Sequence, residues 1–83
     1  MATRQIIIDV PEKVLLAEKI DATMFAIELR TLGAVKLYEL GRLSSGSAAE
    51  LAGMSRIEFL NILGKYKVFP MEAELSELES RHV

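Results

Sequence analysis

The chain has 83 residues, the size of one small domain, so a second independent core is excluded. Hydrophobic residues make up 51% of the chain and charged residues 27%, which is typical of globular proteins rather than disordered or fibrous ones. Cysteine is absent and histidine occurs once, which argues against disulfides, thiolate chemistry and a histidine zinc site. We therefore expect a non-enzyme without cofactors. The apolar run near the N-terminus is too short for a signal or membrane span, which predicts a cytoplasmic protein.

The acidic residues are concentrated at the C-terminal end. The whole chain carries a formal charge of −2, but residues 71–83 alone carry −3 and residues 1–70 carry +1. A nearly neutral body can bind DNA if its cations share one face, and an acidic tail suits a basic protein partner. The alternative is that the tail is a solvated terminus.

The N-terminal third predicts a strand and two helices. Residues 4–10 are rich in isoleucine and valine and alternate in part, which predicts a short strand that ends at Pro11. Its pairing between two chains is favoured, because a lone strand has no ladder partner. A short helix follows over residues 12–19. Asp21 is a candidate N-cap for a longer helix over residues 22–40, which Gly41 ends in the left-handed conformation.

The long helix is apolar on most of its sides. This pattern predicts either a central helix wrapped by its neighbours or a contact between two copies. Gly33 in its middle costs about 1 kcal/mol relative to alanine. That cost indicates close packing against another backbone or a tolerated defect.

The stretch 45–64 has the spacing of a helix-turn-helix. Ser44 or Ser45 can cap a first helix over residues 46–52, and Gly53 can take the positive φ that a tight turn needs. Ser55 and Glu58 have the spacing of a capping box at the start of a second helix that ends near residue 64. Two helices joined by a glycine turn also occur in proteins that never bind DNA.

If the pair binds DNA, its second helix lies in the major groove. Ser55, Arg56 and Asn61 are then the candidate base readers, since arginine bonds guanine and asparagine bonds adenine bidentately. Candidate phosphate contacts are Ser44, Ser45, Ser47, Arg42, Lys65 and Lys67. Ile57 and Leu60 could meet a thymine methyl group, belong to the core, or form a protein interface. The alternative is therefore a helical interaction module or dimeric adaptor without DNA binding.

Beyond the pair, residues 65–70 predict an extended connector and residues 71–81 a weak amphipathic helix. The stretch 37–56 reads LYELGRLSSGSAAELAGMSR, and with IDVPE at 8–12 and EFL at 58–60 it resembles a small prokaryotic family. The members of that family are described as uncharacterised proteins and predicted antitoxins with a helix-turn-helix. The resemblance covers residues 4–70.

The resemblance implies a type II antitoxin that neutralises a toxin with a PIN-domain ribonuclease fold and represses the shared operon as a homodimer. Toxin binding then falls to apolar residues at the C-terminal end, namely Phe69, Met71, Leu75 and Leu78. The opening strand followed by Pro-Glu also resembles ribbon-helix-helix antitoxins, in which Arg4 and Gln5 would read the bases.

The predicted fold is mainly α. It has a short N-terminal β-strand, then a small helical bundle with the helix-turn-helix, and an acidic C-terminal helix or tail. The DNA-binding domain spans residues 1–67 and the partner-binding tail residues 68–83. The predicted partners are operator DNA, the toxin and a second copy.

Overall fold

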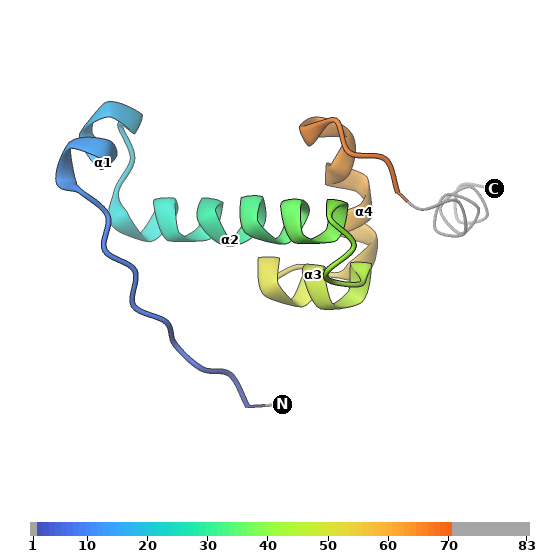
Figure 1. Ribbon diagram of the computed structural model, residues 1–83. Coiled ribbons are helices and arrows are strands. Elements are labelled where there is room, and N and C mark those ends of the chain that lie inside the picture. The colour runs from blue at the N-terminus through green and yellow to red at the C-terminus, as the bar shows by residue number, and fades with distance from the viewer. Residues whose placement is uncertain (1, 71–83) are drawn as a thin grey trace.

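The computed structural model describes residues 2–70, and its regular elements are all helices (Figure 1). The elements in chain order are α1 (Glu12–Glu18), α2 (Ala22–Glu39), α3 (Ser45–Ala52), α4 (Arg56–Ile62) and the 3-10 helix η1 (Leu63–Tyr66). The mainly helical prediction is therefore correct for the described residues, and the helix bounds lie close to those expected.

The predicted strand over residues 4–10 is wrong. Figure 1 shows these residues as an extended thread between the N-terminus and α1, and no strand occurs anywhere in residues 2–70. Their backbone groups form none of the hydrogen bonds found outside the helices. The alternating sequence favours an extended backbone, but a strand also needs a second strand for its ladder. Because this strand is absent from residues 2–70, the interpretation as a ribbon-helix-helix protein has no structural basis there.

The helix ends follow the local sequence signals. The Asp21 side chain accepts a hydrogen bond of 2.8 Å from the Met24 backbone N–H and caps α2. After α2, Gly41 has a φ of +75°, the left-handed conformation predicted for it. Residues 65–70 differ from the expected extended connector, because η1 continues the helical path through Tyr66.

The core lies where the C-terminal half of α2 packs against α3 and α4. At its centre the rings of Tyr38 and Phe59 meet edge to face, with their centroids 5.7 Å apart. The buried hydrophobic residues are Ala34, Val35, Tyr38, Ala48, Ala49, Ala52, Phe59, Leu60, Leu63 and Val68.

The N-terminal half of the described chain adds nothing to this core. No residue from 2 to 33 is buried, and in Figure 1 the first half of α2 extends beyond α3 and α4 toward α1. The long helix is therefore not wrapped by its neighbours over its full length, which removes one of the two interpretations of its apolar pattern.

Within residues 2–70, no helix combines the length and the apolarity that a membrane crossing requires.

Candidate nucleic-acid interface

The α3–α4 pair, residues 45–62, is a tightly packed unit joined by a three-residue turn. Gly53 begins the turn with a φ of +73°, a conformation that favours glycine, and its N–H donates to the Glu50 carbonyl at 3.1 Å. Buried alanines at 48, 49 and 52 leave room for α4 to approach α3. The predicted turn is thus confirmed as a local structure.

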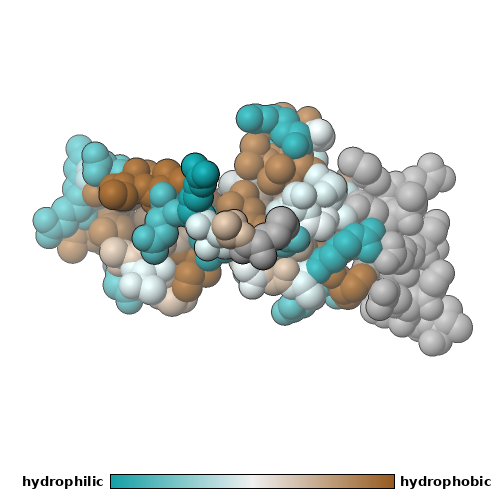
Figure 2. Space-filling view, turned by 90° about the horizontal axis from the view of Figure 1, so that it is seen from below, coloured by the Kyte–Doolittle hydropathy of each residue, from teal (hydrophilic) through white to brown (hydrophobic). Residues whose placement is uncertain are grey.

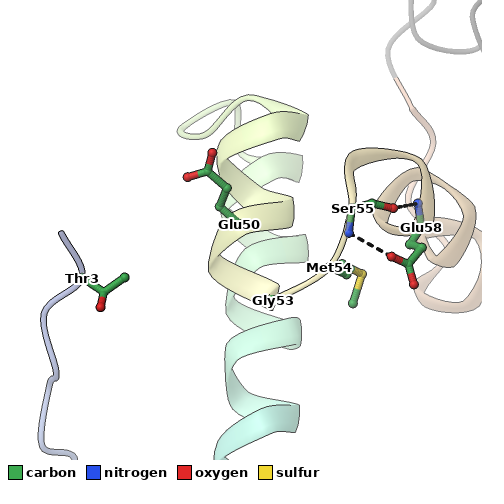
Figure 3. Close-up of a pocket in the computed structure, with 6 residues that line it drawn as sticks. All are labelled: Thr3, Glu50, Gly53, Met54, Ser55 and Glu58. Atoms are coloured by element: carbon green, nitrogen blue, oxygen red, sulfur yellow. Dashed lines mark hydrogen bonds between the residues drawn. The ribbon is translucent and has the colours of Figure 1, made fainter. Parts of the chain in front are cut away.

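The turn leads into α4 through the predicted capping box. The Glu58 backbone N–H donates to Ser55 Oγ at 3.2 Å, and the Ser55 backbone N–H donates to Glu58 Oε1 at 3.0 Å (Figure 3). The hydrogen bond from the Ser55 backbone, with a further one from its side chain, holds the pKa of Glu58 below its ordinary value. At the start of α3 the cap is Ser44, whose Oγ accepts from the Ser47 N–H at 3.1 Å.

Arg56 joins the first turns of the two helices. Its Nε donates to Ser45 Oγ at 2.9 Å, and Ser45 is only 3% exposed. In this structure the guanidinium therefore holds a buried hydroxyl through its Nε. The Ser45 hydroxyl, a candidate phosphate contact from the sequence, lies inside the fold.

Asn61 lies on α4 four residues after Ile57, and Lys65 follows on η1. Asn61 and Lys65 are exposed, whereas Ile57 is half-buried and packs against the core. Lys65 Nζ lies 5.9 Å from the centroid of the Tyr66 ring. Ser44 and Ser55 are exposed too, but their hydroxyls already serve as caps.

Leu60 is a core residue. It is 2% exposed, so the core alternative is correct for Leu60 and an exposed interface of Ile57 with Leu60 is excluded. Leu60 belongs to the same buried cluster as Phe59 and Leu63.

A shallow depression lies beside the turn (Figure 3). The residues that line it are Thr3, Glu50, Gly53, Met54, Ser55 and Glu58. Two of them are carboxylates and none is a cation, which makes this side of the pair unfavourable for phosphate.

Arg30 is a positioning residue that the sequence did not reveal. Its Nε donates to the Leu51 carbonyl oxygen at 2.8 Å and so joins α2 to the end of α3. Its guanidinium also lies 3.5 Å from the place a Gly53 side chain would occupy. A contact across 21 positions leaves no local pattern in a sequence.

An exposed aromatic residue lies close to the end of the described chain. Val68 is buried and anchors the segment after η1, whereas the next residue, Phe69, is 87% exposed. The other predicted toxin-binding residues, Met71, Leu75 and Leu78, lie outside the described residues.

Comparison with known proteins gives one match. A model of an uncharacterised protein family, UPF0175, matches residues 1–81. No curated protein and no solved structure matches the chain. Because the match covers nearly the whole sequence, the chain belongs to the uncharacterised family UPF0175.

Proposed function

We propose that this protein is a type II antitoxin that binds operator DNA through the α3–α4 pair and represses its own operon. The observation that carries the DNA-binding part is the compact pair itself, with its glycine turn, with Asn61 exposed on α4 and with Lys65 exposed on the following η1. This is the arrangement in which a second helix enters the major groove.

The chemistry of the exposed side chains at Asn61 and Lys65 suits DNA. The Asn61 amide can bond an adenine bidentately, and Lys65 can neutralise a phosphate. Arg42 and Lys67 are exposed as further candidate phosphate contacts. Glu58, the acidic residue nearest to them on α4, has one of its oxygens engaged by the Ser55 N–H.

The antitoxin part rests on the resemblance and on the C-terminal end of the chain. Phe69 presents an apolar ring to solvent immediately before the acidic residues 71–83. An apolar anchor followed by carboxylates is complementary to a basic surface such as that of an RNA-cleaving toxin. The proposed partner is a PIN-domain ribonuclease encoded beside this protein.

DNA binding is tested by fluorescence anisotropy on the DNA upstream of the gene. Asn61→Ala is expected to weaken specific binding by about 1–3 kcal/mol, since it removes a bidentate base contact. Lys65→Ala is expected to weaken binding to all sequences, because a phosphate contact carries no sequence information. Lys13→Ala is the matched control, an exposed lysine on α1. Equal affinities for the Lys65 and Lys13 variants would contradict this interface.

Partner binding is tested by co-expression with the neighbouring reading frame. The full chain is expected to co-purify with its product and to relieve its toxicity, while a chain truncated after Pro70 stays folded and fails to neutralise. Phe69→Ala is expected to weaken the complex without changing the helical content. Full neutralisation by the truncated chain would remove the role of the tail.

A second candidate function is a protein-interaction module without DNA binding. The observation in its favour is the exposed apolar surface of the first half of α2, which includes Met24, Ile27 and Leu32. The two candidates differ at low salt, where a DNA-binding protein has its highest affinity for DNA. Absence of any binding there would favour the interaction module.

A further inference from the structure

The N-terminal half of the described chain lacks the burial that would stabilise it. No residue of α1 is buried, and neither is any residue of α2 before Ala34. A seven-residue helix without buried side chains is marginal in water, because most helical stability in proteins comes from packing. Figure 2 shows hydrophobic surface spread over the end of the molecule that holds α1 and the N-terminal segment. Nothing within residues 2–70 covers that end.

One side of α2 forms a continuous unpartnered stripe. Its members are spaced three or four residues apart and so share one side of the helix. This α2 stripe consists of Phe25, Leu29, Leu32, Gly33, Lys36 and Leu40. Leu29, Leu32 and Leu40 are 37%, 41% and 58% exposed, whereas Ala34, Val35 and Tyr38 pack the opposite side of α2 into the core.

Gly33 is a second, independent observation on the same stripe. A Cβ added at this position meets nothing within 4 Å, so no contact inside the described chain requires a glycine. The φ of Gly33 is not positive either, so the backbone conformation does not require a glycine at this position. A glycine in the middle of a helix destabilises it, so its presence is explained where another backbone comes close.

We propose that the α2 stripe is the face on which a second copy of this chain docks, with the two α2 helices antiparallel. The charges favour this occupant and this direction. Glu28 lies one turn before Leu32 and Lys36 one turn after it, so an antiparallel copy brings each Lys36 near the partner's Glu28. Within its own chain Lys36 is paired with Glu39, with its Nζ 2.8 Å from the carboxylate, and both side chains are exposed to a second copy. A parallel copy would place like charges together and align the two helix dipoles.

The stripe alone is smaller than a stable dimer interface. At about 1.5 Å per residue it is about 22 Å long, and one helix is about 10 Å wide. Each partner of a standard interface contributes about 800 Å². A dimer interface therefore also has to include other exposed apolar side chains of the N-terminal half, such as Ile6, Ile7, Ile8 and Leu16. This inference does not depend on DNA or toxin binding.

The first test compares two leucines of equal exposure. Leu29 on the stripe and Leu51 on α3 are both 37% exposed, so a glutamate costs each site a similar desolvation. In sedimentation equilibrium without DNA, the wild type and Leu51→Glu are expected to be dimers at about 100 μM. Leu29→Glu is expected to raise the dissociation constant by about 100-fold or more, with unchanged helical content by circular dichroism.

A charge exchange tests the direction of the pair. Lys36→Glu adds a third acidic side chain to Glu28 and Glu39 on the stripe and its edges. This variant is expected to weaken the dimer. The double variant Glu28→Lys with Lys36→Glu restores an opposite-charge contact and is expected to recover the dimer. Recovery would be absent in a parallel pair, where each residue faces its own copy.

Three results would overturn the proposal. They are a wild-type chain that is monomeric at about 100 μM, a dimer that Leu29→Glu leaves intact, and a double charge variant that associates no better than Lys36→Glu alone. A chain that is monomeric by itself but binds the product of the neighbouring reading frame through Leu29 would assign the stripe to that partner instead. Failure of DNA binding would leave all of these measurements unaffected.

Discussion

The bond between Arg56 and Ser45 makes a prediction that separates a positioning role from a base-reading role. Replacing Arg56 by alanine removes the donor to Ser45 Oγ, a bond of 2.9 Å at a residue that is 3% exposed. Water has little access to the hydroxyl that is left behind. The variant should therefore lose stability as well as any DNA affinity.

The magnitude follows from the burial of the acceptor. A hydrogen bond to a charged group contributes about 1.5–3 kcal/mol, and an unpaired buried polar group costs about 1–3 kcal/mol. We expect Arg56→Ala to lower the free energy of unfolding by about 1–3 kcal/mol. Ser45→Ala should cost less, because the half-buried guanidinium can still reach water. For a chain of this size the total stability is about 4–12 kcal/mol, so the loss is measurable.

The assay is urea unfolding followed by far-ultraviolet circular dichroism, at one fixed chain concentration because self-association shifts apparent stability. A double-mutant cycle with Ser45→Ala isolates the bond, and the coupling free energy is expected to be about 1 kcal/mol. The positioning role of Arg56 is refuted if the free energy of unfolding of Arg56→Ala lies within about 0.5 kcal/mol of the wild-type value and the effects of Arg56→Ala and Ser45→Ala are additive.

Three further predictions concern the same unit. Gly53→Ala should lower the free energy of unfolding by about 1–2 kcal/mol, since its φ of +73° is strained for a residue with a Cβ; an unchanged urea midpoint would speak against this. Phe59→Ala should cost about 3–5 kcal/mol and come close to abolishing cooperative unfolding, because the ring is fully buried; a sharp transition of wild-type midpoint would be inconsistent with that core. The lowered pKa of Glu58 adds stability that is present above its unfolded pKa, near 4.5, and is lost as the pH falls through the lower folded pKa. The stability difference between wild type and Glu58→Gln should therefore shrink in acid, and a difference independent of pH would exclude the capping carboxylate as its source.

The features that the sequence predicts best are those set by neighbouring residues. Asp21, Gly41, Gly53 and the pair of Ser55 with Glu58 each act within one helical turn, so their spacing alone specifies the structure. The strand over residues 4–10 failed for the opposite reason. Its sequence favours an extended backbone, but a strand exists only with a partner elsewhere.

The candidate site was predictable in outline but not in the use of each side chain. The sequence names Asn61 and Lys65 as candidate DNA contacts, and both are exposed in the structure. The sequence cannot reveal that Arg56 bonds Ser45 or that Leu60 turns inward, because both depend on how α3 and α4 pack. The bond from Arg30 to the Leu51 carbonyl is a similar consequence of tertiary structure.

The central claim, that the α3–α4 pair binds DNA, is tested most directly by the salt dependence of binding to the upstream DNA. The affinity is expected to fall linearly with the logarithm of salt concentration, and Lys65→Ala is expected to reduce that slope by about one phosphate contact. Lys13→Ala should leave the slope unchanged. Absence of binding at low salt, or equal slopes for wild type and Lys65→Ala, would contradict the claim.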